Sequence, residues 1–273
     1  METGREIKFE SPSFAERLRG MLGVDFYRLF HTPLYYIFLA IAAIIPAMIL
    51  GMTTVEGGAP LYSNTWNIVA ADTPIYVFEG IGEYANMNMV FIFGGIMVSI
   101  FIGHDYKSGY VKQLFTTHPK KQDYMLSKTI TCAFSMACMC VTYLLGGVIA
   151  GLLTSADMSV NPGSLVLAIL SKIVLSLGWA SLYTFLNVIF RKYFGISIAS
   201  SFFFGTGILI IGASAIIGDS SSALLNVFLY GSSVNACLNS NIFTLIICIL
   251  VSVGWTIVYN LLGTLVLSKS DVY

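Results

Sequence analysis

Six long apolar runs limit what this chain can fold into. A run of about 17 to 25 apolar residues crosses the roughly 30 Å hydrocarbon core of a bilayer as one α-helix, whereas barrel strands are about ten residues long and alternate in polarity. The runs here are continuous: Leu34–Met52, Met87–Gly103, Thr129–Thr154, Ser164–Phe190, Gly195–Ile217 and Asn241–Leu267. The sequence therefore predicts an all-α polytopic membrane protein with six transmembrane helices.

The composition excludes a water-soluble globular protein. Of the 273 residues 56% are hydrophobic and 10% are charged, whereas soluble domains contain about 25% charged residues. We therefore expect the lipid bilayer as surroundings, no nucleic-acid partner, and a single transmembrane domain over residues 1–273.

The basic residues predict the orientation. All of the 14 lysines and arginines except Lys172 lie before the first run, between the second and third, between the fourth and fifth, or after the sixth. The connections on the other side, 53–86, 155–163 and 218–240, contain none and hold six acidic residues. Because lysine and arginine favour the cytoplasmic side, we expect both termini in the cytoplasm and a multi-pass protein of the plasma membrane, with 53–86 and 218–240 as extracellular loops.

The segment 1–33 is expected to be an amphipathic interfacial segment. Apolar side chains recur at helical spacing from Phe14 to Phe30, which is typical of a helix lying on the membrane. Ser13 and Glu16 have the spacing of a capping box at the start of this helix. The first thirty residues are charged throughout, so we expect the first apolar run to serve as the targeting signal instead of a cleaved peptide.

The two long outer loops differ in character. The loop 53–86 contains glycines, prolines and aromatic residues, and it is either a cap or substrate-entry rim, or a solvated connection with interfacial aromatics. The loop 218–240 contains the apolar run Ala223–Tyr230, which is too short to span and fits a re-entrant or interfacial helix.

The cytoplasmic loop 104–128 contains a short amphipathic helix by its periodicity. One face is apolar and the other polar: Tyr110, Val111, Leu114 and Phe115 against Lys107, Lys112, Gln113 and Thr116. The helix is expected to start near Lys107 and to end by His118, because Pro119 disfavours helical geometry in the residue before it. Two interpretations remain: the helix docks into a groove of a partner, or it lies on the anionic inner leaflet, held by its lysines.

A longer pattern in this loop resembles the first cytoplasmic loop of type-2 ABC exporter permeases. The residues that carry the resemblance are Phe101-Ile-Gly-His-Asp105-Tyr-Lys-Ser-Gly109-Tyr-Val-Lys112-Gln-Leu-Phe115, then His118-Pro119, then Tyr124-Met-Leu-Ser127-Lys128. In that family an acidic residue follows the second span, a glycine comes next, and a short coupling helix meets the ATPase subunit. The acidic position is often glutamate there and is Asp105 here.

A second stretch, Asp25-Phe-Tyr-Arg28-Leu-Phe30, is similar to the entry helix of these permeases, in particular of the bacterial lantibiotic-immunity and bacitracin-type members. The resemblance implies a separate ABC ATPase partner and a second permease copy or a related permease. It also assigns ATPase coupling to nine residues: Asp105, Gly109, Tyr110, Val111, Lys112, Leu114, Phe115, His118 and Pro119.

The chain has no phosphate-binding loop of the form Gly-x-x-x-x-Gly-Lys-[Ser/Thr]. We therefore expect it to be a non-catalytic subunit that binds no cofactor itself, with ATP bound by the partner ATPase. The three histidines are scattered without metal-ligand spacing, so no metal site is assigned.

Lys172 is the only basic residue inside a predicted span. It lies either on a substrate path or in an interhelical contact, or its stem snorkels to the outer interface. The small residues of the third and fifth runs, such as Gly146 and Gly205, are expected to allow close helix packing within the subunit or, alternatively, at a dimer face.

Together these features predict the membrane subunit of an ATP-driven exporter. The apolar spans favour an amphipathic or hydrophobic substrate, and the resemblance implies antimicrobial peptides or lipid-like drugs, hence a role in antimicrobial peptide resistance. Two alternatives remain: a secondary transporter driven by an ion gradient, and a non-transporting sensor or scaffold. A secondary transporter would place charged groups and broken helices near the bilayer midplane.

Overall fold

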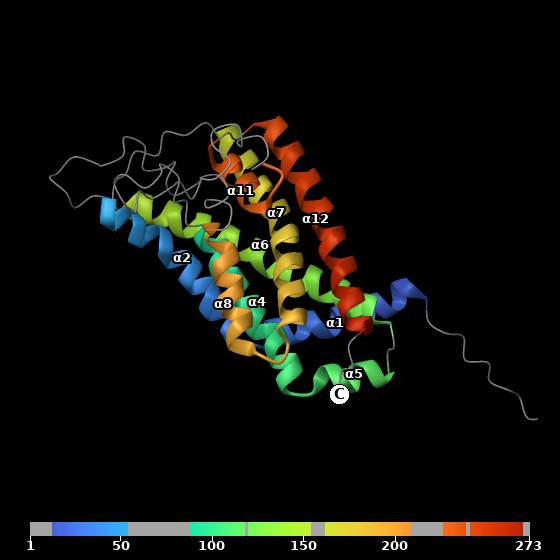
Figure 1. Cartoon of the computed structure of the whole chain (residues 1–273). Helices are drawn as coiled ribbons and strands as arrows, with labels where there is room; N and C mark the ends of the chain where they lie inside the picture. Colours follow the sequence, from blue (N-terminus) through green and yellow to red (C-terminus); the bar gives the residue numbers. More distant parts are fainter. Residues whose placement is uncertain are drawn as a thin grey trace, which may run out of the picture.

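The computed structural model describes residues 13–53, 88–117, 120–153, 162–208, 226–238 and 241–269. Within these ranges all regular structure is helical, which confirms the all-α prediction (Figure 1). The helices are α1 (Phe14–Phe30), α2 (Pro33–Thr53), α4 (Met89–Lys107), α5 (Tyr110–Thr117), α6 (Lys121–Leu153), α7 (Pro162–Ile189), α8 (Phe194–Gly205), α11 (Leu229–Leu238) and α12 (Ile242–Lys269).

Four of the described helices, α4, α6, α7 and α12, are long and apolar enough to cross a membrane, and the bent pair α1–α2 passes the same test as a fifth. The apolar helix α8 is shorter. Each of these helices overlaps one of the six predicted runs, and six spans remain a prediction; the second half of the fifth run and most of the loop 53–86 lie outside the described residues.

Helix α1 begins and ends where its sequence directs. The capping box is confirmed: Ser13 Oγ accepts from the backbone N–H of Glu16, and the Glu16 carboxylate accepts from the backbone N–H of Ser13 at 2.8 Å. The chain then bends by 66° into α2. Pro33 occupies the first position of α2, where its missing N–H costs nothing, and it disfavours helical geometry at Thr32. The bend therefore sets α1 across the end of the bundle (Figure 1).

Helix α6 begins at Lys121, about two turns before the apolar run that starts at Thr129, and its polar first turns are largely buried against other helices. Two predicted boundaries were wrong. Helix α4 continues to Lys107, so α5 begins only at Tyr110. In the loop 218–240 the helix is α11, which starts at Leu229, and residues 226–228 form a turn.

The centre of the bundle is built around α7, which contacts α12, α6, α4, α11 and α8. An aromatic column fills it: Phe91 of α4 stacks on Trp179, and Trp179 stacks on Tyr183, with ring centroids 5.6 and 5.5 Å apart. The indole N–H of Trp179 donates to Ser233 Oγ of α11 at 3.0 Å. This column holds α11 against the spans.

Two glycines confirm that small residues serve packing within the subunit. A Cβ on Gly146 of α6 would lie 2.1 Å from the carbonyl oxygen of Ala43 in α2, so these backbones touch. A Cβ on Gly205 would lie 2.9 Å from the Tyr183 hydroxyl. Helix α8 ends there, and Gly207 has a φ of 68°, a conformation that glycine adopts without strain.

Candidate functional site

A group of four charged residues, of which three are buried and Arg28 is partly exposed, lies where α1, α4 and α6 meet. This ionic cluster consists of Asp25 and Arg28 of α1, Asp105 of α4 and Lys128 of α6. Lys128 Nζ lies 2.6 Å from Asp25 Oδ1 and 2.6 Å from Asp105 Oδ2, and the Arg28 guanidinium donates to Asp105 Oδ1. The side chains of Lys128 and Asp105 are fully buried.

The ionic cluster is neutral as a whole. Two carboxylates face two cations, and Ser127 Oγ donates to the second oxygen of Asp25 at 2.7 Å. Removing ions from water is expensive, and the charges are tolerated only because each has an opposite charge and hydrogen bonds. The cluster therefore fixes the relative positions of three helices, and loss of one member leaves a net charge on the other three.

Aromatic rings close the cluster on the side of α5. The Arg28 guanidinium carbon lies 4.4 Å from the ring centroid of Tyr110, the first residue of α5. Lys128 Nζ lies 4.9 Å from the ring centroid of Phe101 in α4. Burial raises the pKa of Tyr110, and the negative charge of Asp25 raises it further. The Tyr110 ring is therefore neutral at physiological pH, as a cation–π contact requires.

Helix α5 packs its apolar face against the protein itself. Val111 is 1% exposed and belongs to an apolar cluster that includes Met21 of α1, Tyr124 of α6 and Leu267 of α12. Phe115 meets Tyr124 edge to face, with ring centroids 5.5 Å apart. This differs from the expectation that the apolar residues anchor α5 in a partner, because residues at the ends of α1, α6 and α12 already pack against them.

The polar face of α5 remains exposed, with Lys112, Gln113 and Thr116 on it. The turn before α5 depends on Gly109, whose φ is 75°. Since L-residues rarely adopt this conformation, glycine at this position sets the direction in which α5 leaves α4.

Further polar contacts join the same helices. Arg17 Nε of α1 lies 2.8 Å from Asp123 Oδ2 of α6, and Lys121 Nζ donates to the carbonyl oxygen of Leu267 in α12. Both acidic residues that α4 and α6 contribute, Asp105 and Asp123, are therefore used internally.

The structure brings most of the predicted coupling residues together, although their role toward an ATPase stays a prediction. Asp105 lies in the ionic cluster, and the others that are described form α5 and its preceding turn: Gly109, Tyr110, Val111, Lys112, Leu114 and Phe115. His118 and Pro119 lie outside the described residues.

Lys172 lies away from this site. It is on α7, 6% exposed, and its Nζ is 5.4 Å from the ring centroid of Tyr143 in α6. This geometry is an interhelical contact, one of the alternatives for this residue, and it differs from a side chain that snorkels to the interface.

Sequence reasoning missed Asp25, Arg28 and Lys128 as one group, because 77 to 103 residues separate the two residues of α1 from their partners in α4 and α6. One signal was available. Met21, Asp25 and Leu29 are four residues apart and form the buried stripe of α1, so an acid stands in an apolar series. Such an acid needs a buried cation as partner.

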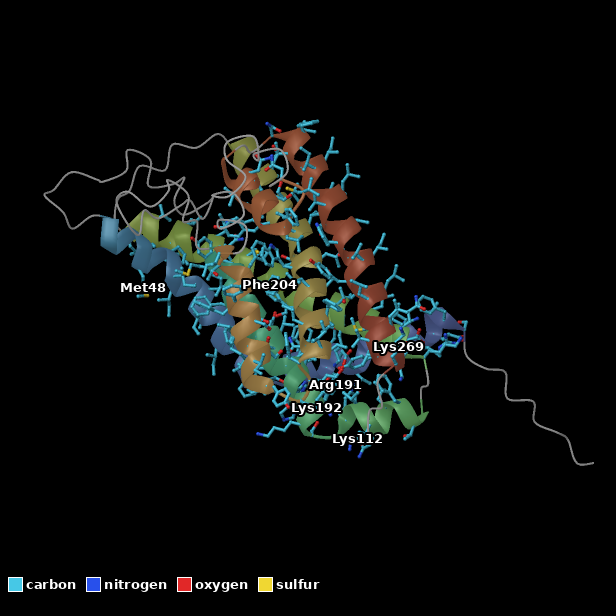
Figure 2. The ribbon with its side chains drawn as sticks, in the orientation of Figure 1. Met48, Lys112, Arg191, Lys192, Phe204 and Lys269 are labelled. Atoms are coloured by element: carbon cyan, nitrogen blue, oxygen red, sulfur yellow. The ribbon has the colours of Figure 1, made fainter. Side chains whose placement is uncertain are left out.

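Basic side chains gather at the end of the bundle where α5 lies. Figure 2 shows Lys112, Arg191, Lys192 and Lys269 at this end and Met48 toward the opposite end. Among the described residues, no group of three or more histidine, cysteine or acidic side chains could hold a metal ion. The site is an arrangement of charges and aromatic rings between helices.

The comparisons with known proteins agree with this geometry. The family model described as "ABC-2 family transporter protein" matches residues 31–208, from the bend before α2 through α8. A search of the curated proteins found no match. The matched range covers more than half of the 273 residues and includes Asp105, α5 and Lys128. The chain therefore belongs to the ABC-2 family of transporter proteins, whose members are the non-catalytic membrane components of ABC transporters.

Proposed function

We propose that this chain is the membrane-spanning permease subunit of an ATP-driven exporter of the bacterial plasma membrane, with α5 as the coupling helix of a separate ATPase subunit. The observation behind the proposal is that the two faces of α5 differ: one is attached to the spans and the other is accessible to a partner. Its apolar face is fixed to α1, α6 and α12, and its polar face is exposed at the basic end of the bundle. A helix held in this way moves together with the spans.

In the proposed mechanism, ATP binds to the ATPase, whose closure displaces α5. Tyr110 passes the displacement to Arg28, and through the ionic cluster it reaches α4 and α6 together. Rigid transmission requires contacts whose lengths change little when one helix moves, and short charge-assisted hydrogen bonds are contacts of this kind. The spans then change their mutual packing and release the substrate on the other side.

The proposed substrate is amphipathic or hydrophobic, for example an antimicrobial peptide. Apart from the charged residues at the helix ends near α5, Lys172 is the only charged residue in the described spans. A path for a small ion would require several polar groups near the midplane. Because the chain supplies six apolar runs, we further propose that a second copy or a related permease completes the translocation path.

The test is reconstitution in lipid vesicles. The purified chain alone is expected to hydrolyse no ATP and to co-purify with an ATPase when the two are expressed together. Vesicles with both subunits are expected to move a fluorescent amphipathic peptide only when ATP is supplied. Movement driven by an ion gradient without ATP would favour a secondary transporter, and ATPase binding without any movement would favour a sensor or scaffold.

A further inference from the structure

The described residues at the end of the bundle that carries α5 expose almost only positive charge. Asp25, Asp105 and Asp123 are each at most 2% exposed, and each is paired with a cation. Among the described residues at this end, the exposed acid is Glu16, whose carboxylate caps α1. The exposed basic residues at this end are Arg19, Lys107, Lys112, Lys120, Lys192 and Lys269.

Three of these lysines accompany α5. Lys107 ends α4 just before it, Lys112 lies on its polar face, and Lys120 follows shortly after its last described residue. We call these three residues the basic strip. Figure 2 shows Lys112 directed away from the spans.

Membrane topology explains the exposed cations at this end but not the burial of the acidic residues. The preference of lysine and arginine for the cytoplasmic side places the cations here, but it does not require the acids to be internal, because acidic residues contribute little to topology. Here the acids are withdrawn into ion pairs. Among the described residues, the exposed charges of the strip are therefore not offset by neighbouring carboxylates, and their field extends outward.

The covered apolar face of α5 favours a protein over the lipid headgroups as the occupant of this surface. A helix that lies on a membrane immerses its apolar face in the lipid, but the apolar face of α5 is covered by Met21, Tyr124 and Leu267. The face that remains is polar and points away from the spans.

We propose that the basic strip docks against an acidic surface of the ATPase subunit, so that docking is governed by charge and depends on salt. This inference rests on the proposed function and adds the chemistry of the partner's surface. In this arrangement the apolar residues of α5 fix the helix to the spans, and its lysines select the partner.

The test uses the full chain in phosphatidylcholine nanodiscs and the ATPase that co-purifies with it, purified separately. Reversing the strip with Lys107→Glu, Lys112→Glu and Lys120→Glu is expected to weaken ATPase binding about tenfold or more, because exposed charge pairs act mainly on association. Wild-type binding is expected to weaken as the salt concentration rises from about 0.05 to about 0.5 M, because the Debye screening length shortens strongly over this range. The corresponding glutamine variant, which introduces no repulsion, should bind with intermediate affinity.

Lys269→Glu is the matched control, since Lys269 is an exposed lysine at the same end but on α12. Its binding is expected to equal that of the wild type, and an equal loss in this control would overturn the assignment to the strip. Unchanged ATPase binding by the triple variant would overturn the inference while leaving the proposed function intact. If the triple variant instead loses only a preference for phosphatidylglycerol nanodiscs, the strip binds lipid and the inference is wrong. Failure of the wild-type chain to bind any ATPase would overturn both.

Discussion

Lys128 of α6 places its Nζ 2.6 Å from Oδ2 of Asp105 in α4, and both side chains are fully buried. The same ammonium group also pairs with Asp25 of α1, so one cation joins three helices. We expect Lys128→Met to lower the stability of the folded chain by about 3–5 kcal/mol, because it leaves buried carboxylates with too few cations. Thermal unfolding in detergent, followed by circular dichroism, measures this loss.

The control for this variant also removes the negative charge of Asp25, which Lys128→Met leaves without its cation. Adding Asp25→Asn to Lys128→Met leaves Arg28 and Asp105 as a neutral pair, and most of the lost stability should return. Equal melting temperatures for the wild type and Lys128→Met would show that the cluster does not stabilise this junction.

Variants of Tyr110 test whether its aromatic ring transmits movement from α5 to Arg28. Its contact with the Arg28 guanidinium requires an aromatic face and not the hydroxyl. Tyr110→Phe is therefore expected to keep ATP-driven transport close to the wild-type rate, whereas Tyr110→Ala removes about 0.5–2 kcal/mol of contact and should lower transport per ATP hydrolysed. The ratio of peptide moved to phosphate released measures this coupling, and equal ratios in both variants would contradict the proposed route.

Gly109 tests whether the direction of α5 matters. Its φ of 75° costs a residue with a side chain about 1–2 kcal/mol, and no atom would lie within 4 Å of an added Cβ, so strain is the only effect. We expect Gly109→Ala to weaken ATPase binding by severalfold. Gly20→Ala is the control, since its added Cβ also meets nothing within 4 Å, but Gly20 lies inside α1 and has no positive φ; its binding should not change.

The contact between Gly146 and Ala43 tests the packing of α2 on α6. A Cβ at Gly146 would overlap the carbonyl oxygen of Ala43, so Gly146→Ala must push the helices apart, at a cost of about 1–3 kcal/mol. Gly254→Ala on α12 meets no atom within 4 Å and should have little effect. A lower melting temperature is expected for the first variant alone; equal values would argue against close contact of these backbones.

The sequence was sufficient for features that depend on local periodicity. The long apolar runs predicted the spans, Ser13 and Glu16 predicted the start of α1, and Pro119 limited α5 from its C-terminal side. Each of these signals is contained within a few turns of one helix, so no knowledge of distant segments was needed.

What depends on distant partners was not predictable. The apolar face of α5 was identified correctly, but a sequence pattern does not say whether such a face is covered by the same chain or by another. The burial of the first turns of α6 could not be read from the apolar run at Thr129, because Asp123 and Lys128 become buried only when Arg17 and Asp25 are placed beside them. Tertiary pairing buries these charged positions.

The length of α6 has a consequence for the choice of bilayer. Its 33 residues measure about 50 Å at 1.5 Å per residue, whereas the hydrocarbon core is about 30 Å thick. The helix must therefore tilt or protrude, and its charged first turns at Lys121–Lys128 reach the headgroup level most easily in thin bilayers. Residues 129–153 alone measure about 38 Å, so the charged turns stay outside the hydrocarbon, and a thinner bilayer is met by a larger tilt of α6. Lipid chain length is thus a variable that acts directly on the junction between α1, α4 and α6.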